Sequence, residues 1–442
     1  MIIEQLYDKG LAHGSYIIIS DGQAAVIDPA RDPQPYYDFV EKHQAKIVAI
    51  IETHPHADFV SSHHEIAQKT GATIYVSKLL GADYSHQTFD DGNEISLGKI
   101  KLVAMNTPGH SPDSICVLLK DEQGKDHSLF SGDTLFVGDV GRPDLRESVG
   151  NLTAQREELA RAMFHSVQDK LKKLHEEVLV YPAHGAGSLC GKNLSSDLSS
   201  SIGRELKTNY AFQISDESEF VKALIQDQPF VPKYFGYDVN LNKQGAASFE
   251  ASIAAVPRIA SNSVLEKGVL IIDARPQTDF RNGHIYGSIN LMDGGKFETW
   301  LGSVVGPEEQ FYLIAESVEK LEILIRKAAK IGYESRIKGA LTPPAQMIET
   351  LEEVDVDDVR DLKELYTIVD IRNTGETATR RIFPGALEIP LPELRERIEE
   401  IPTNKPILVH CAGGYRSAAG ASIIQPFVNV PVYDLGEAVL TF

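Results

Sequence analysis

Residues 53–60 read THPHADFV, and this stretch decides how the N-terminal half of the chain is interpreted. His54, His56 and Asp58 alternate along one turn, so two imidazoles and a carboxylate can reach a metal ion from a single loop. The common form of such a turn is H-x-H-x-D-H, and Phe59 stands where the third histidine would be. The phenylalanine therefore bears on the number of metal ions that the loop can help to hold.

Further candidate ligands each follow an apolar, strand-like run. They are His110 in NTPGHSPDS, Asp133 in LFSGDTLFVGD and His184 in VYPAHGAGS. Loops that follow the strands of one sheet can meet at one edge, where such residues converge. A lone histidine in such a place is usually an ordinary surface or hydrogen-bonded residue. Several candidates at strand ends, flanked by Gly or Pro, favour a metal cluster instead.

Residues 1 to about 190 alternate strand-like runs with amphipathic stretches, which predicts a layered α/β domain. The expected strands cover residues 16–19, 24–27, 47–51, 73–76, 100–103, 115–119 and 178–180. The expected helices cover residues 35–44, 153–174 and 195–212. The stretch 228–244, rich in Pro, Tyr and Asn, is interpreted as a linker.

The motifs THPHADF, TPGHSPDS, SGDTLF and YPAHG together resemble the metallo-β-lactamase fold, an αββα sandwich, over essentially all of residues 1–190. Within that superfamily the chain is similar to glyoxalase II-like hydrolases and, more closely, to persulfide dioxygenases. The closer resemblance rests on VGRPDL at 140–145, AHGAGSLCGKN at 183–193 and SIGRE at 201–205, where Ser201 replaces a Thr. It implies a domain over residues 1–240, with a helical extension and linker at its end, in which Arg142 binds substrate.

The resemblance also carries ligand assignments. Binuclear hydrolases of this fold bind two metal ions. The ligands of the first ion occupy the positions of His54, His56 and His110, and those of the second ion occupy the positions of Asp58, Phe59 and His184. The residue at the position of Asp133 bridges the two ions. Since Phe59 removes an imidazole from the second set, a second ion would have too few ligands. The site is therefore expected to be mononuclear.

One metal held by two imidazoles and one carboxylate keeps three positions open, which suits Fe(II) and O₂ chemistry. The ligands of persulfide dioxygenases correspond here to His54, His110 and Asp133, so one Fe(II) per chain is expected on these residues. The neighbouring polar residues would hold the ligands or water by hydrogen bonds, and they are His56, Asp58 and His184. A closed structural zinc site is disfavoured because the cluster contains no thiolates of the usual kind.

Cys190 follows His184 by six residues in a Gly-rich loop. A thiol there can meet a substrate in the metal pocket. Two interpretations stand side by side: a small half-buried residue, or a catalytic residue that carries or receives sulfur. The resemblance to persulfide dioxygenases that carry a fused rhodanese favours the second.

The second half of the chain repeats itself. VLIIDAR at 269–275 is echoed by TIVDIR at 367–372, and GHIYGS at 283–288 is echoed by IFPGA at 382–386. The aspartates Asp273 and Asp370 lie 97 positions apart, which is about one small domain. We expect two homologous α/β modules, at 258–342 and 355–442, each built on a buried strand that ends in D-x-R.

The last module contains ILVHCAGGYRSAAGAS at 407–422, an apolar strand followed by a cysteine loop and a helix-forming run. Cys411 at the start of this turn faces backbone N–H groups and the positive end of the helix, and Arg416 adds a full charge. These features favour a thiolate nucleophile in an anion-binding loop, in which Gly413, Gly414 and Tyr415 are expected to bind the substrate. The C-x-x-x-x-R loop and the D-x-R strand resemble a rhodanese, a sulfurtransferase that carries sulfur as a cysteine persulfide. The related arginine phosphatases have a loop one residue longer.

The middle module has AESVEK at 315–320 in the corresponding place, with no cysteine and with two carboxylates. It is expected to be catalytically inactive and to have an architectural role.

Together these features predict a persulfide dioxygenase that makes sulfite from a thiol persulfide and O₂. The rhodanese would pass the sulfane sulfur of a second persulfide to sulfite and form thiosulfate. The combined reaction would serve sulfide detoxification. The thiol carrier can be glutathione, coenzyme A, bacillithiol or another. The main rival is a glyoxalase II-like thioester hydrolase with an accessory rhodanese, which is best served by two metals. A sulfur-carrier or sensor scaffold with an inert metal domain is a third alternative, and it leaves the metal-binding residues unexplained.

The composition of the chain disfavours some classes of binding partner and bears on its location. The 442-residue chain has a formal net charge of −20, which disfavours nucleic acid and anionic membrane surfaces as partners. Three widely spaced cysteines argue against a disulfide framework. The sequence shows neither a secretory leader nor an apolar run long enough to span a membrane, so a cytoplasmic location and a homo-oligomer, a dimer or a tetramer, are expected.

Overall fold

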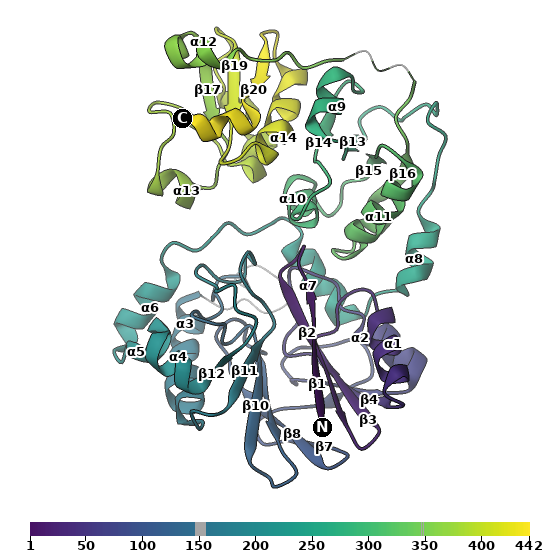
Figure 1. The fold of residues 1–442 in the computed structure, drawn as a ribbon, viewed down its shortest axis with the longest axis vertical. Coiled ribbons are helices and arrows are strands. Elements are labelled where there is room, and N and C mark those ends of the chain that lie inside the picture. Colours follow the sequence, from purple (N-terminus) through teal and green to yellow (C-terminus); the bar gives the residue numbers. More distant parts are fainter. Residues whose placement is uncertain (146–155, 346, 348) are drawn as a thin grey trace. The chain divides into compact units, whose positions relative to one another are not determined.

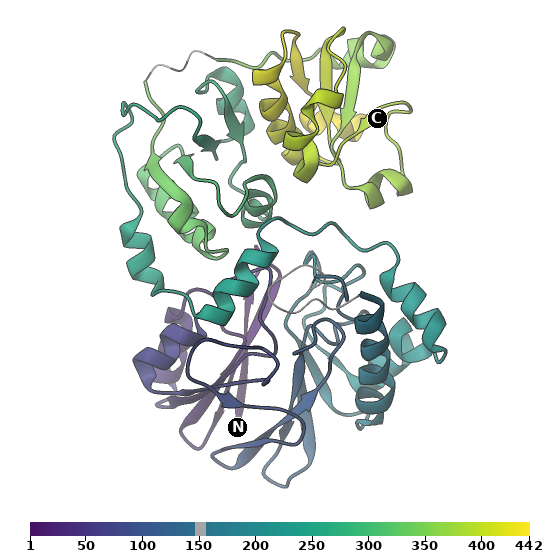
Figure 2. The ribbon, with the colours of Figure 1, turned by 180° about the vertical axis from the view of Figure 1, so that it is seen from behind.

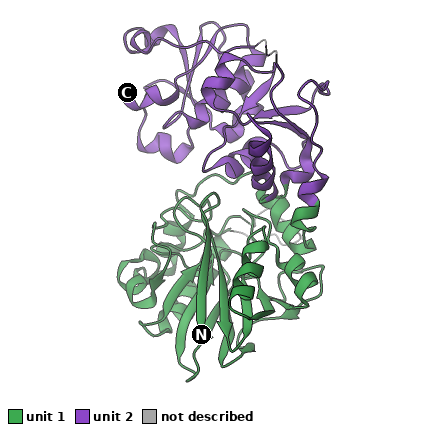
Figure 3. Cartoon of the chain, turned by 45° about the vertical axis from the view of Figure 1, so that its right-hand side comes forward, with its two compact units in different colours: residues 1–251, 330–332 green, residues 252–329, 333–442 purple. Residues whose placement is uncertain are grey.

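The computed structural model describes residues 1–145, 156–345, 347 and 349–442. They form two compact units: an N-terminal unit of residues 1–251 and 330–332, and a C-terminal unit of residues 252–329 and 333–442 (Figure 3). Among the described helices, none combines the length and the apolar character that a membrane crossing requires.

Two six-stranded sheets form the centre of the N-terminal unit. The first has the order β1 (Ile2–Asp8), β2 (His13–Ser20), β3 (Gln23–Ile27), β4 (Lys46–Ile51), β5 (Thr73–Val76) and β6 (Gln87–Thr88). The second has the order β12 (Ser200–Ser201), β11 (Leu179–Pro182), β10 (Asp126–Gly132), β9 (Ile115–Lys120), β8 (Ile100–Asn106) and β7 (Glu94–Leu97). Each of the seven strands expected from the sequence overlaps one of these.

Alternating side chains give both sheets two apolar faces. In β2, Tyr16 and Ile18 belong to the core between the sheets, whereas Ile17 and Ile19 pack on the opposite face. That outer face is covered by α1 (Gln34–Lys42) and α2 (His63–Thr70). The outer face of the second sheet is covered by α3 (Arg156–His165), α4 (Ile202–Thr208), α5 (Tyr210–Gln213) and α6 (Glu217–Ile225), as the view from behind shows (Figure 2). These four layers make the αββα sandwich that the sequence predicts.

Two expectations about helical segments need correction. Residues 195–199 are not helical, and the helix expected from 195 begins only with α4. The presumed linker 228–244 contains a helix, α7 (Phe235–Gln244). Its buried face mixes polar and apolar residues, which hid the helical period from the sequence pattern. The helix expected at 153–174 is confirmed over 156–173, as α3 followed by a π turn and a 3₁₀ turn, while 153–155 lie outside the described residues.

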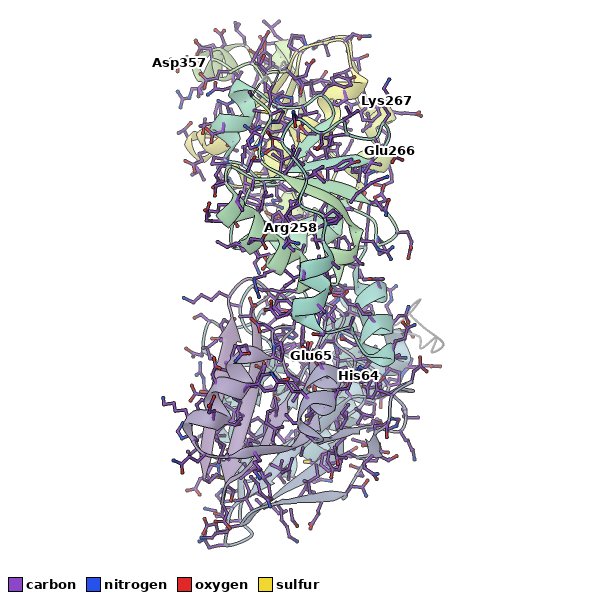
Figure 4. The ribbon with its side chains drawn as sticks, turned by 90° about the vertical axis from the view of Figure 1, so that its right-hand side faces the viewer. His64, Glu65, Arg258, Glu266, Lys267 and Asp357 are labelled. Atoms are coloured by element: carbon purple, nitrogen blue, oxygen red, sulfur yellow. The ribbon has the colours of Figure 1, made fainter. Side chains whose placement is uncertain are left out.

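The chain after α7 is tied back to the first sheet's helices. Glu65 of α2, labelled in Figure 4, accepts hydrogen bonds from the Ser248 hydroxyl at 2.9 Å and from the Phe249 backbone N–H at 2.8 Å. Phe249 begins α8 (Phe249–Ala255). The segment beyond residue 240 is therefore an ordered part of the N-terminal unit.

The C-terminal unit repeats one sheet topology twice (Figure 1). The middle module has the parallel order β14 (Ser288–Asn290), β13 (Leu270–Asp273), β15 (Phe311–Ile314) and β16 (Ile337–Leu341). The last module has the parallel order β18 (Leu387–Glu388), β17 (Thr367–Asp370), β19 (Ile407–His410) and β20 (Val432–Asp434). Their main helices are α9 (Gln277–Asn282), α10 (Phe297–Val304) and α11 (Val318–Ala329), then α12 (Val356–Asp361), α13 (Thr374–Thr379) and α14 (Tyr415–Ile424).

Both D-x-R elements have the same geometry. Asp273 and Arg275 form a buried ion pair at 2.6 Å, and Asp370 and Arg372 form another at 2.6 Å. Each arginine makes several hydrogen bonds to its aspartate, which satisfies both charges locally. The repeated sequence thus corresponds to a repeated structural device at the end of β13 and of β17.

Candidate metal centre and cysteine loop

The predicted metal-binding residues converge at one end of the two sheets of the N-terminal unit. His54 follows β4, His110 follows β8, Asp133 follows β10 and His184 follows β11. Among the described residues, four groups at this place have potential ligand atoms within 4.8 Å of one another, and two of them consist of Asp133, His184 and Cys190 and of Asp28, Glu52 and His56. The other two groups are the two predicted sets. The first donor set is His54, His110 and Asp133, and the second donor set is His56, Asp58 and His184.

Hydrogen bonds donated by the Nδ1–H groups orient both imidazoles of the first donor set. The Thr53 hydroxyl donates to Asp28 at 2.8 Å, so it can only accept from the Nδ1–H of His54, at 3.0 Å. The Nδ1–H of His110 donates to the backbone carbonyl of Arg142 at 2.9 Å. Both Nε2 atoms therefore carry a lone pair, the tautomer that a metal ligand needs.

Asp133 completes this set. Its Oδ2 lies 3.7 Å from Nε2 of His54 and 3.6 Å from Nε2 of His110, and it is buried with no hydrogen-bond partner among the described residues. Burial alone would raise the pKa of Asp133, but His184, which is charged and hydrogen-bonded to it, holds this pKa well below its usual range. A buried anionic oxygen facing two nitrogen lone pairs is costly unless a cation lies between them. These residues therefore fit a divalent metal ion.

Gly141 lets two loops of this centre approach each other. A Cβ at this position would lie 2.0 Å from the backbone oxygen of Asp133 and 2.9 Å from Nδ1 of His110. Any side chain there would therefore push apart two residues of the first donor set.

Charged neighbours surround the second donor set, although His56 Nδ1 and Nε2, Asp58 Oδ1 and His184 Nε2 make no hydrogen bond among the described residues. His184 bridges two carboxylates, with Nδ1 2.7 Å from Asp133 and Nε2 2.9 Å from Asp58. Burial would lower the pKa of His184, but these two carboxylates raise it well above its ordinary value. His56 Nε2 lies 3.3 Å from Asp28. The second donor set is therefore held by a network of ion pairs.

Phe59 fills the space beside this network. Its ring centroid lies 3.9 Å from that of His13, 4.4 Å from that of His56 and 6.4 Å from that of His184. The side chain is 1% exposed. An apolar ring thus occupies the position where the H-x-H-x-D-H motif would supply an imidazole.

Sequence reasoning missed the residues that hold the metal-binding loop. Asp28 accepts from both the backbone N–H and the hydroxyl of Thr53, at 2.7 and 2.8 Å. Asn242 of α7 donates to the carbonyls of His56 and Phe59, at 2.9 and 2.8 Å. Its oxygen also accepts from the backbone N–H of Ser61 at 2.8 Å. Asp28 could have been suspected because it ends a strand before Pro29, but Asn242 has no recognisable signal.

Arg142 and Cys190 lie beside the centre. The Arg142 side chain is 1% exposed, and its guanidinium bonds Asp144 at 2.6 and 2.7 Å and the carbonyl of Leu189 at 3.1 Å. Its backbone joins Cys190 to His110, since its N–H donates to the Cys190 carbonyl at 2.9 Å. The Cys190 thiol lies within reach of Asp133 and His184, and burial raises its pKa well above the usual range.

The cysteine loop of the last module lies between β19 and α14. Cys411 is 1% exposed, and its sulfur accepts a hydrogen bond from the backbone N–H of Gly414 at 3.1 Å. Gly414 has a φ of +93°, and a Cβ there would lie 2.7 Å from the backbone nitrogen of Glu437, so the loop requires glycine at this position. Gly413 has open space where its Cβ would lie. The loop therefore directs a backbone donor at the sulfur, as an anion-binding turn does.

The charged group of this loop is already paired. Arg416 makes two hydrogen bonds to Glu376 of α13, at 2.6 and 2.7 Å. Glu376 also accepts from the backbone N–H of Asn373 in a capping box. The hydroxyl of Tyr415 donates to the carbonyl of Met292 at 2.6 Å, so this end of the side chain lies against the middle module.

The middle module differs at the same topological position. Ala315 follows β15 as Cys411 follows β19, and Lys320 then stands where Arg416 does. Lys320 lies 3.0 Å from Asp293. This module thus keeps a cation at the arginine position but lacks the nucleophile.

Known families account for most of the chain. The family described as "Metallo-beta-lactamase superfamily" matches residues 9–184, and the family described as "Rhodanese-like domain" matches residues 258–338 and 355–437. The crystal structure of a metallo-beta-lactamase from Staphylococcus aureus subsp. aureus COL is 34% identical, with a TM-score of 0.70, and the similarity covers 77% of this chain and 99% of that one. The resemblances inferred from the motifs are confirmed.

Similar proteins differ in their activities. The human mitochondrial persulfide dioxygenase ETHE1 is 28% identical over 189 residues, which cover 42% of this chain and 68% of that protein. The cytoplasmic hydroxyacylglutathione hydrolase of Arabidopsis thaliana is 36% identical over 132 residues, 29% of this chain. The chain spans about half the length of that hydrolase, 51%. An oxygenase and a hydrolase are therefore both represented among its relatives.

Proposed function

Because the chain belongs to the metallo-β-lactamase superfamily and carries rhodanese-like domains, we propose that it is a persulfide dioxygenase coupled to a thiosulfate-forming sulfurtransferase. We assign residues 1–240 to the dioxygenase domain, 258–342 to an inactive rhodanese-like domain and 355–442 to the active one. The substrates would be low-molecular-weight persulfides, O₂ and sulfite.

A single observation carries the choice of the dioxygenase. The first donor set presents two imidazole lone pairs and one carboxylate oxygen without a hydrogen-bond partner among the described residues, whereas in the second Phe59 stands where an imidazole would be and His184 pairs with both Asp58 and Asp133. Three ligands on a single ion favour Fe(II), which when bound offers open positions for O₂ and a sulfur anion together.

The surrounding residues prepare the centre for that substrate pair. His184 keeps Asp133 and Asp58 oriented through its two ring nitrogens. Thr53 and the Arg142 carbonyl hold the two ligand imidazoles, and Phe59 excludes water from the adjoining space. Since the Arg142 guanidinium is occupied by Asp144, we propose that Arg142 acts through His110 and the Cys190 loop. The balanced reaction is R–S–SH + O₂ + H₂O → R–SH + HSO₃⁻ + H⁺, in which O₂ takes the electrons lost by the outer sulfur.

The second step belongs to Cys411. Its thiolate attacks the outer sulfur of a persulfide, forms Cys–S–S⁻ and releases R–SH. Sulfite then attacks that outer sulfur, the S–S bond to Cys411 breaks, and thiosulfate leaves with the thiolate restored. The Gly414 N–H points at the Cys411 sulfur, so it stabilises the thiolate that attacks the persulfide and the thiolate that is restored when thiosulfate leaves.

A thioester hydrolase is the second candidate. The Arabidopsis relative and the proximity of the second donor set to the first favour it, because a binuclear centre can hold a nucleophilic hydroxide. Phe59 counts against the hydrolase, because it stands where a binuclear centre has an imidazole ligand.

Product analysis tests the coupling. Wild type and Cys411→Ser would be compared after equal persulfide-dependent O₂ consumption, with sulfite and thiosulfate quantified. Cys411 belongs to a different compact unit from the metal centre, so the substitution should leave O₂ uptake and metal content unchanged. Sulfite should then accumulate in place of thiosulfate. An unchanged thiosulfate yield would contradict the role of Cys411 and direct attention to Cys190.

A further inference from the structure

An aromatic ring of the middle module contacts the cysteine loop of the last module. Trp300, the single tryptophan of the chain, lies half-buried in α10, and the guanidinium carbon of Arg416 is 5.4 Å from its ring centroid. This distance is within the range of a cation–π contact. Arg416 is therefore held by Glu376 of its own module and by Trp300 of its neighbour.

The two contacts constrain the guanidinium in different ways. Glu376 occupies N–H groups on Nη1 and Nη2 of Arg416. An aromatic face holds the planar group without accepting any of its five N–H donors. Trp300 can therefore fix the orientation of Arg416 while leaving its remaining donors to an anion.

The rest of the middle module holds α14 in place beside this contact. The Tyr415 hydroxyl at the start of α14 donates to the Met292 carbonyl at 2.6 Å. Further along the same helix, the Ser422 hydroxyl accepts from the backbone N–H of Asn290 at 2.9 Å. The helix that begins at the cysteine loop thus contacts the strand β14 and the loop that follows it.

The inactive site of the middle module stabilises that same loop. Lys320 and Lys327 of α11 both bond Asp293, the residue after Met292. Burial would raise the pKa of Asp293, but the two lysines lower it, so the carboxylate stays charged and bonded. The lysine at the arginine position therefore anchors the loop that supports Tyr415 instead of binding a ligand anion.

We propose that Trp300 is a positioning residue of the sulfur-transfer site, through which the inactive module orients Arg416 for anionic sulfur donors and acceptors. The proposal rests on the sulfurtransferase activity proposed above. Trp300→Leu removes the π face, so the KM for thiosulfate should rise about fivefold. The kcat should change much less, because the Gly414 N–H and Cys411 remain in place. Trp300→Phe keeps an aromatic face and should restore most of the lost affinity.

Steady-state thiosulfate:cyanide sulfurtransfer by the full-length chain tests the proposal. Tyr286→Phe is the matched control, since it removes a hydrogen bond of 3.1 Å to the Pro426 carbonyl between the same two modules. It should leave both constants at their wild-type values. If Trp300→Leu behaves like Tyr286→Phe, or if Trp300→Phe fails to restore the KM, the positioning role is wrong.

A chemical readout separates this proposal from the proposed activity. The rates at which iodoacetate and neutral iodoacetamide alkylate Cys411 would be measured by mass spectrometry. Trp300→Leu should lower the iodoacetate rate relative to the iodoacetamide rate, because only the anionic reagent depends on Arg416. The ratio of the two rates can be measured even if the wild type transfers no sulfur. A wild type that transfers no sulfur would refute the proposed sulfurtransferase activity but not the positioning role of Trp300. An unchanged ratio would overturn the positioning role.

Discussion

The two donor sets of the N-terminal unit are built from similar residues, yet they are arranged for different purposes. In the first, hydrogen bonds orient the imidazoles from behind, and the Asp133 Oδ2 is left without a hydrogen-bond partner among the described residues. In the second, His184 forms ion pairs with Asp58 and Asp133, and Phe59 stands at the position of a further imidazole. The number of metal ions that a cluster of histidines and carboxylates binds therefore cannot be inferred from its residue types alone. The number of ions depends on whether each set of ligands is complete, and Phe59 leaves the second set one imidazole short.

The largest expected effect separates the two sets directly. Asp133→Ala or His110→Ala removes one of three ligands, so bound metal and O₂ uptake should be lost together. His184→Ala should keep most of the metal, because His184 contacts carboxylates and not the ligand nitrogens. Metal per chain, measured by mass spectrometry, checks both. Equal loss in His184→Ala and His110→Ala would refute the assignment of ligands.

The next substitution would convert the second set into a metal site. Phe59→His restores the H-x-H-x-D-H motif, so zinc-loaded protein should gain a second bound ion. Phe59→Leu is the control: it removes the ring without adding a ligand and should keep the wild-type metal content. Equilibrium dialysis against zinc measures both variants. If Phe59→His binds no additional zinc, Phe59 is not what limits the metal count.

A smaller effect is expected from the residue that orients His54. Thr53→Val keeps the side-chain shape but removes the hydroxyl between Asp28 and His54 Nδ1, so metal affinity should fall about tenfold or more. Thr53→Ser retains the hydroxyl and should bind metal nearly as wild type does. Competition with a chelator gives the affinities. Equal affinities for the Val and Ser variants would show that this hydrogen bond does not tune the ligand.

The smallest effect is expected at Cys190. Cys190→Ser should leave the metal content unchanged, because the thiol is not among the first donor set and Asp133 is already held by His184. Metal analysis of the purified variant checks this. Loss of metal in this variant would mean that Cys190 is itself a ligand.

The sequence pointed to those candidate residues of the site that follow strand-like runs. His54, His110, Asp133 and His184 were found because each follows an apolar run, and the ends of such runs meet in space. Strand β10 was not predicted as an element, since its first residues, Asp126, His127 and Ser128, interrupt the apolar pattern.

Sequence patterns could not predict the residues that hold the metal-binding loop in place. Asn242 contacts residues more than 180 positions away, and a polar residue buried on a helix face looks like a solvent-exposed one in the sequence. The contact between Trp300 and Arg416 is equally invisible, because it joins two modules that the repeat alone presents as independent.

The most direct test of a one-metal oxygen chemistry combines two readings on protein purified without added metal. The first is the metal content, and the second is O₂ consumption with a thiol persulfide and with a glutathione thioester. We expect about one iron per chain, and O₂ uptake that requires the persulfide. Two tightly bound zinc ions per chain, or thioester hydrolysis without O₂ uptake, would contradict it.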